Sequence, residues 1–148
     1  MTLFFPDLNV WLALSVAEHT HSVKSWKWLN LLPRDAGLIF SRYTQIGILR
    51  LLTNQAAMGE QTLKLKQAWA VYERWLEDPR VEFYPEPRGF DAAFRKATAP
   101  LATQTASKWI GDCYLLAYAL ESDAHLVTFD QALLKFARKH GYRAIVPD

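Results

Sequence analysis

The stretch HLVTFDQALLKFA, residues His125 to Ala137, joins a short apolar run to the start of a helical pattern, with Asp130 at the junction. A bounded run of four to eight apolar residues is typical of a buried strand, and apolar residues three or four positions apart are typical of a helix. The stretch therefore predicts a strand that passes directly into a helix. It also predicts that a carboxylate stands where the strand ends.

The same succession of strand and helix recurs along the chain. We expect strands in residues 2–6, 36–41, 80–85, 125–129 and 143–147. We expect helices in residues 9–17, 21–32, 42–54, 61–79, 112–123 and 131–141, and at most one short helix in 85–107. Short apolar strands that alternate with helices predict a parallel sheet covered on both faces. The fold class is therefore α/β, a three-layer α/β/α domain with a short, mostly parallel central sheet.

Length and composition limit the alternatives further. The chain has 148 residues, of which 51% are hydrophobic, so we expect a single folded domain spanning residues 1–148. The net charge of +2 is too small to indicate nucleic-acid binding by itself. The single cysteine, Cys113, cannot form an internal disulfide and favours a reducing compartment. The apolar N-terminal stretch is too short and too interrupted, by Pro6 and Asp7, to span a membrane, so we expect a cytoplasmic protein.

Four polar residues fall where strands end and helices begin. Asp7 ends the first strand, and Gln45 lies in the opening turns of the helix after the second. Asp112 starts a helix, and Asp130 ends the fourth strand. In right-handed strand-helix-strand units these positions share one edge of the sheet, the edge at which open α/β sheets bind ligands. Carboxylates gathered there repel one another, and a hard cation such as Mg²⁺ or Mn²⁺ relieves the repulsion.

Helix capping is the alternative explanation for acidic residues at these positions. Aspartate and asparagine are favoured N-cap residues, and Asp7, Asn9, Asp112 and Asp130 each stand at or near a predicted helix start. Capping does not require so many aspartates at one edge, however. The joint pattern therefore favours a metal site that can activate water and offset charge on a phosphodiester.

Four segments carry a family resemblance: FPDLNVWLAL (5–14), SRYTQIGILRLLTN (41–54), GDCYLLAYALE (111–121) and HLVTFDQAL (125–133). In order and spacing they resemble the PIN-domain ribonucleases, in particular the VapC toxins of bacterial and archaeal toxin-antitoxin pairs. The resemblance covers nearly the whole chain. It implies a metal-dependent endoribonuclease that leaves a 3′-hydroxyl and a 5′-phosphate. It also implies a homodimer that a cognate antitoxin neutralises.

The resemblance also assigns roles to individual residues. It implies that Asp7 and Asp112 are metal ligands, and that Asp130 binds the metal directly or through water. Asn9 would orient Asp7 or the site water. Thr128 either supplies a hydroxyl close to the site or is an ordinary β-branched strand residue.

Gln45 departs from the family pattern. Many relatives carry glutamate in the helix after the second strand, and glutamine offers a carbonyl oxygen without negative charge. We therefore expect weaker metal binding and a site that relies on the three aspartates. The alternative function is an RNA-binding module of the same fold, its nuclease activity impaired by Gln45. A different Mg²⁺-dependent phosphohydrolase rests on fold analogy alone.

Other candidates are open to two interpretations. Arg42 and Arg50 can each meet a phosphate, but Arg50 can equally pair with an aspartate of the site, and we favour that structural role. His19 and His21 are expected to cap a helix or lie on the surface, because hard cations prefer oxygen ligands. The tryptophan-rich helices in residues 22–32 and 62–78 are candidate surfaces for the dimer or the antitoxin.

Overall fold

The structure of residues 1–148, a computed structural model, contains one five-stranded sheet. Its strands are β1 (Leu3–Pro6), β2 (Gly37–Phe40), β3 (Val81–Phe83), β4 (Ala124–Val127) and β5 (Ala144–Ile145). Their order across the sheet is β3-β2-β1-β4-β5, and every neighbouring pair is parallel. The five expected strands are confirmed, and the sheet is wholly rather than mostly parallel.

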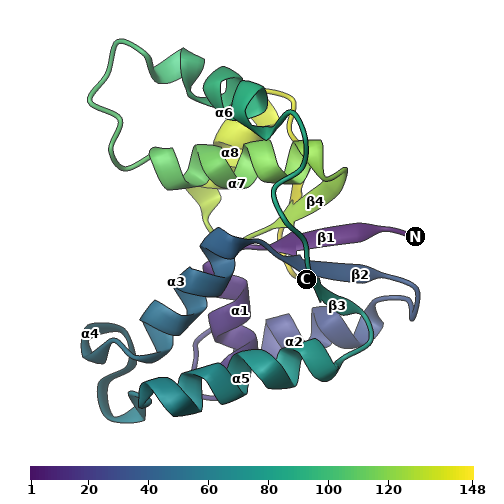
Figure 1. Ribbon diagram of the computed structural model, residues 1–148, viewed down its shortest axis with the longest axis vertical. Coiled ribbons are helices and arrows are strands. Elements are labelled where there is room, and N and C mark those ends of the chain that lie inside the picture. Colours follow the sequence, from purple (N-terminus) through teal and green to yellow (C-terminus); the bar gives the residue numbers. More distant parts are fainter.

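Eight α-helices cover the sheet. They are α1 (Leu8–Ser15), α2 (Ser22–Leu31), α3 (Arg42–Leu52), α4 (Gln55–Met58), α5 (Leu65–Glu77), α6 (Phe90–Thr98), α7 (Ile110–Glu121) and α8 (Gln131–Lys139). Helices α1, α2, α3 and α5 lie on one side of the sheet, and α6, α7 and α8 lie on the other (Figure 1). The expected three-layer α/β/α fold is confirmed. None of the helices is long and apolar enough to cross a membrane.

Each central strand is apolar on both faces, which explains why helices cover both. Successive side chains of a strand point to opposite faces. In β2, Ile39 packs in the core beneath α6, α7 and α8, whereas Leu38 and Phe40 pack in the core beneath α1, α2, α3 and α5. In β4, Leu126 packs in the core beneath α6, α7 and α8, and Val127 packs in the core on the other face.

The connections contain three short elements that the apolar patterns did not predict. Helix α4 has only four residues and is capped by Asn54, whose side chain accepts a hydrogen bond from the Ala57 N–H. It is followed by a 3₁₀ turn at Gly59–Gln61, and another 3₁₀ turn at Ala99–Leu101 follows α6. The expectation of one short helix in residues 85–107 is met by α6.

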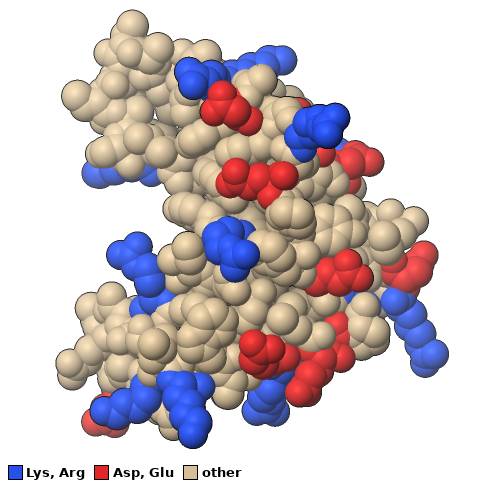
Figure 2. Space-filling view, viewed as in Figure 1, with Lys and Arg blue, Asp and Glu red and all other residues tan.

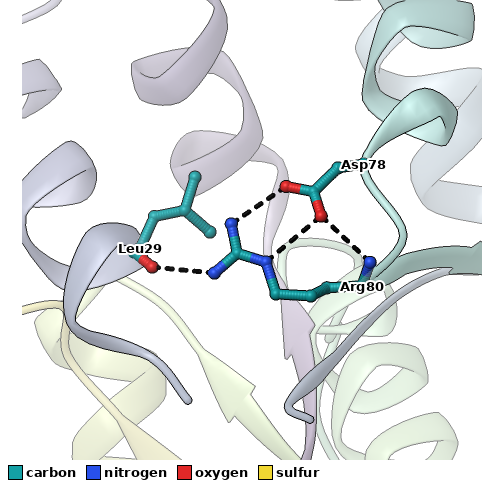
Figure 3. Close-up of polar contacts among 3 residues, drawn as sticks. All are labelled: Leu29, Asp78 and Arg80. Atoms are coloured by element: carbon teal, nitrogen blue, oxygen red, sulfur yellow. Dashed lines mark hydrogen bonds and ion pairs between the residues drawn. The ribbon is translucent and has the colours of Figure 1, made fainter. Parts of the chain in front are cut away.

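Arg80 ties the start of β3 to α2 (Figure 3). Its guanidinium donates hydrogen bonds of 3.1 and 2.9 Å to the two carboxylate oxygens of Asp78, and one of 3.1 Å to the carbonyl of Leu29. The bond from Arg80 is the largest cause that holds the pKa of Asp78 below its ordinary value. The turn between α5 and β3 is thereby fixed against the end of α2.

Candidate active site at the carboxyl edge of the sheet

Thr128 links the ends of the adjacent parallel strands β1 and β4. Its hydroxyl donates a hydrogen bond of 2.8 Å to Asp7 Oδ2 and accepts one of 3.1 Å from the backbone N–H of Asp130. Thr128 is fully buried, and Asp7 is only 8% exposed. Two aspartates from opposite ends of the chain are therefore brought to the same edge, with a buried hydroxyl between them.

Asp7 and Asp130 are also helix caps. Asp7 is the N-cap of α1, where its Oδ1 accepts a hydrogen bond of 2.6 Å from the Leu8 N–H. Asp130 is the N-cap of α8, where its Oδ1 accepts one of 3.1 Å from the Leu133 N–H. The capping interpretation is right for these two residues. It does not exclude metal binding, because each cap uses only one of the two carboxylate oxygens.

Asp112 has a different environment. It lies in the first turn of α7, where Trp109 occupies the N-cap position, and it forms no hydrogen bond or ion pair with the protein. Burial raises the pKa of Asp112 to about 6, and the negative charges of Asp130 and Asp7 contribute. Burial also raises the pKa of Asp7, with a smaller contribution from the charge of Asp130. The three carboxylates are therefore close enough to repel one another.

The donor set fits a hard divalent cation in its chemistry. No lysine or arginine neutralises the three carboxylates, because the ion pairs of the chain are Arg80 with Asp78, Arg95 with Asp91, and Arg143 with Asp123. The side chains are not gathered into a group of three or more His, Cys, Asp or Glu residues arranged to hold a metal ion. The three carboxylates, as placed, therefore do not form a complete coordination site.

Gln45 lies in the first turns of α3, at the same edge of the sheet, but its side chain is bonded to a neighbour on that helix. Its Oε1 accepts a hydrogen bond from the Arg42 guanidinium. Burial raises the pKa of the Tyr72 phenol of α5, and Arg42 and the nearby Gln45 side chain oppose that rise. Arg42 in turn lies over the ring of Phe83, 4.4 Å from its centroid. The carbonyl oxygen expected to face the site is thus already bonded to a cation of the protein.

Two expected contacts of the site are not found. Asn9 forms no hydrogen bond with Asp7: α1 begins at Leu8, so Asn9 is already its second residue, and its side chain is exposed. The alternative role of Asn9, orienting the site water, stays a prediction. Asp7 is oriented instead by Thr128 and the Leu8 N–H. The favoured pairing of Arg50 with an aspartate is also absent, because Arg50 lies exposed in the last turn of α3 and joins no ion pair.

The two histidines contact an aromatic neighbour and each other. The ring of His21 stacks on Phe129 with centroids 4.1 Å apart, and the His21 N–H donates a hydrogen bond of 3.0 Å to His19 Nδ1. His21 occupies the N-cap position of α2, but its side chain forms no capping hydrogen bond. Capping, one of the two expected roles, is therefore not found, and both side chains are only partly exposed.

Tyr43 is a candidate that the sequence did not reveal. Its ring stacks on Tyr114 of α7 with centroids 4.6 Å apart, and it is 39% exposed. Burial raises the pKa of its phenol, the charges of Asp112 and Asp7 raise it further, and the charge of Arg50 lowers it. Tyr43 therefore lies among the candidate site residues. The space-filling view shows the molecule hollowed between the parts that carry α3 and α7, with lysine and arginine side chains along the rim (Figure 2).

Comparison with known proteins agrees with this architecture. The family model of the PIN domain matches residues 4–139. Ribonuclease VapC41 of Mycobacterium tuberculosis (strain ATCC 25618 / H37Rv) is 37% identical over 134 residues, which cover 88% of this chain and 90% of that protein. The chain is a PIN-domain protein of the VapC ribonuclease family. Ribonuclease VapC29 of the same organism is 29% identical over 143 residues, 95% of this chain and 92% of that protein.

Solved structures share the fold of this VapC-family PIN domain. VapBC2 from Rickettsia felis, bound to a DNA fragment from its promoter, has a TM-score of 0.72 at 15% identity, covering 99% of this chain and 100% of that one. VapBC-1 from nontypeable Haemophilus influenzae has a TM-score of 0.71 at 16% identity, with 98% of each chain covered. At these identities the similarity shows the fold alone. The family resemblance inferred from the four sequence segments is confirmed.

Proposed function

We propose that this PIN domain is a Mg²⁺- or Mn²⁺-dependent endoribonuclease and the toxin of a type II toxin-antitoxin system. One observation carries the proposal: Asp7, Asp112 and Asp130 come from three distant segments, and burial, together with the charges of Asp130 and Asp7, raises the pKa of Asp112. Clustered carboxylates of this kind favour a cation. Membership of a family whose relatives are ribonucleases supports RNA as the substrate.

Asp7, Asp112 and Asp130 would hold the ion through carboxylate oxygens, the ligands that Mg²⁺ and Mn²⁺ prefer. The ion would make a water molecule more acidic and offset negative charge on the phosphodiester. Thr128 keeps Asp7 Oδ2 in place, and the Leu133 N–H keeps Asp130 Oδ1 in place. Attack of water on phosphorus, with the ribose 3′-oxygen leaving and taking up a proton, gives the 3′-hydroxyl and 5′-phosphate products.

Arg50 is the arginine best suited to bind the RNA backbone. It is exposed and pairs with no carboxylate, whereas Arg42 is engaged by Gln45 and lies over the ring of Phe83. A guanidinium is a planar donor that matches the geometry of a phosphate. Gln45 then supports the site indirectly, by holding Arg42 away from the aspartates.

We further propose that the chain acts as one domain in the cytoplasm, forms a homodimer and binds a cognate antitoxin. Similarity of fold to VapBC structures supports an antitoxin partner. The segments 22–32 and 62–78 retain exposed aromatic surface, because Trp26 and Trp69 are 41% and 40% exposed. A cavity of about 430 Å³, lined partly by Trp26 and Trp75, lies between α1, α2 and α5 and belongs to the same surface.

The second candidate is an RNA-binding module with impaired nuclease activity. It is favoured by Gln45, which is not acidic and whose carbonyl oxygen is bonded to Arg42, and by the absence of a preformed group of three metal ligands. Both candidates bind RNA. They differ in whether a divalent ion makes the chain cut it.

Cleavage of an end-labelled RNA separates the two functions. We expect the wild type to cut in Mg²⁺ or Mn²⁺, to stop in EDTA, and to leave ends that an adaptor ligase accepts without phosphatase or kinase treatment. Asp7→Asn and Asp112→Asn should slow cleavage by roughly a hundredfold or more while RNA binding persists. Asp91→Asn, at an exposed ion pair outside the site, is the matched control. RNA binding without metal-dependent cleavage would instead favour the second candidate.

A further inference from the structure

We propose that Tyr43 is a substrate-contact residue of this site, whose hydroxyl donates a hydrogen bond to a phosphate oxygen of the RNA beside Asp112. The inference rests on the proposed function, because it assumes an RNA backbone in the hollow between α3 and α7. It is carried by three features of Tyr43: its fixed ring, its unpaired hydroxyl and its contact with Gly111.

The ring of Tyr43 is held in a stack of aromatic side chains. Tyr114 lies against it with centroids 4.6 Å apart and planes inclined by 27°. Tyr114 is itself stacked on Tyr118 and packed against Phe90. A side chain fixed in this way loses little conformational entropy when it binds a ligand.

The hydroxyl of Tyr43 is a free donor. It forms no hydrogen bond with the protein, although the side chain is 39% exposed. Burial raises the phenol pKa above its ordinary value of 10.0, so the group carries its proton at neutral pH. A neutral donor near the carboxylates of Asp112 and Asp7 is suited to a phosphate, which the carboxylates themselves repel.

Gly111 places that hydroxyl next to the proposed metal ligands. A Cβ atom built on Gly111 would lie 2.4 Å from the Tyr43 hydroxyl oxygen and 3.5 Å from the ring carbon that bears it. The hydroxyl therefore occupies space that a side chain at position 111 would take. Because Asp112 follows directly in the chain, a phosphate held at Asp112 lies within reach of Tyr43.

Arg50 extends the same face of α3. Tyr43, Ile46 and Arg50 are spaced at i, i+3 and i+7, which places them along one side of the helix. Ile46 is 47% exposed, so this side of α3 is not covered by the core. Tyr43 beside the aspartates and Arg50 at the far end of α3 give two donors for successive parts of the RNA backbone.

Four proteins test the inference: wild type, Tyr43→Phe, Gly111→Ala and the double variant. Tyr43→Phe keeps the ring stack and removes only the hydroxyl, so we expect kcat/KM on a defined RNA to fall about tenfold or more. Gly111→Ala displaces the hydroxyl and should cause a similar loss. In the double variant the new methyl group meets only the ring carbon, at an ordinary contact distance, so its kcat/KM should be no lower than that of Tyr43→Phe.

Two further measurements separate substrate contact from a structural effect. The rise in melting temperature caused by Mg²⁺ should be the same in Tyr43→Phe as in wild type, and RNA affinity in an Asp7→Asn background should fall. Unchanged kcat/KM in Tyr43→Phe, a lost Mg²⁺ response, or losses that multiply in the double variant would overturn the inference while the nuclease proposal stands. A wild type that cuts no RNA in Mg²⁺ would overturn both.

Discussion

The hydroxyl of Thr128 donates a hydrogen bond of 2.8 Å to Asp7 Oδ2 across the boundary between β4 and β1. The hydroxyl oxygen of Thr128 also accepts a hydrogen bond from the backbone N–H of Asp130. Because Thr128 is fully buried, no solvent replaces either bond when the hydroxyl is removed. Thr128 therefore determines the geometry of two of the three proposed metal ligands.

Thr128→Val tests this relationship. Valine keeps the shape of threonine but leaves a buried carboxylate oxygen and a backbone N–H without their partner, so we expect the free energy of unfolding to fall by about 1–3 kcal/mol. Urea unfolding at neutral pH measures the change. Thr128→Ser keeps the hydroxyl and loses one methyl group, so its loss should be about 1 kcal/mol. An equal free energy of unfolding for Thr128→Val and wild type would show that the hydrogen bonds of the Thr128 hydroxyl contribute nothing to stability.

Asp112→Asn should change how stability depends on pH. The pKa of Asp112 is raised to about 6 in the folded protein, above its ordinary value of 3.8, so the folded state binds this proton more tightly than the unfolded state. The contribution of that proton to the free energy of unfolding is present in full below about pH 4, and it is lost as the pH rises through about 6. In EDTA, Asp112→Asn should therefore melt above wild type at pH 7.5, and the difference should shrink toward pH 4.5. A difference independent of pH would contradict the assigned pKa.

Arg50→Ala tests the proposed contact with the RNA backbone. Because Arg50 is exposed and unpaired, its removal should change the free energy of unfolding by less than about 0.5 kcal/mol. RNA affinity should fall, and the slope of log Kd against log salt concentration should decrease by about 0.7, the value for one phosphate contact on a single strand. Fluorescence anisotropy in EDTA measures both. An unchanged slope would rule out a phosphate contact.

Arg80→Met should affect stability and leave the site intact. Arg80 is 19% exposed and bonds both Asp78 and the Leu29 carbonyl, so its loss should cost about 1–3 kcal/mol of unfolding free energy (Figure 3). Arg95→Met breaks an exposed ion pair and should leave the urea unfolding midpoint close to that of wild type. The rise in melting temperature caused by Mg²⁺ and the rate of RNA cleavage should be the same in both variants as in wild type. Loss of cleavage in a folded Arg80→Met protein would mean that the site extends to β3.

The fold could be predicted from local patterns because β1, β2 and β4 each pass almost directly into a helix. The junctions after β1 and β4 put Asp7 and Asp130 at the carboxyl edge of a parallel sheet, and this placement does not depend on the conformation of the loops. Thr128 lies two positions before Asp130, so its place near the end of β4 could be predicted from the same junction.

Side-chain direction on the helices could not be predicted in this way. Whether Gln45 or Tyr43 faces the aspartates depends on how α3 is rotated against its neighbours. That rotation is set by long-range contacts such as Gly47, where a Cβ atom would lie 2.4 Å from the Leu8 side chain of α1. The stack of Tyr43 on Tyr114 is likewise formed only after α3 and α7 meet.

The central claim is that Asp7, Asp112 and Asp130 share one divalent ion, and thermal unfolding in a Mg²⁺ titration tests it most directly. Wild type and the surface control Asp91→Asn should gain stability with Mg²⁺, by about 2.7 kcal/mol at a hundred times the dissociation constant. Asn at position 7 or 130 preserves a good N-cap, so these variants and Asp112→Asn should stay folded yet lose most of the gain. An equal rise in melting temperature in all five proteins would contradict a shared metal site.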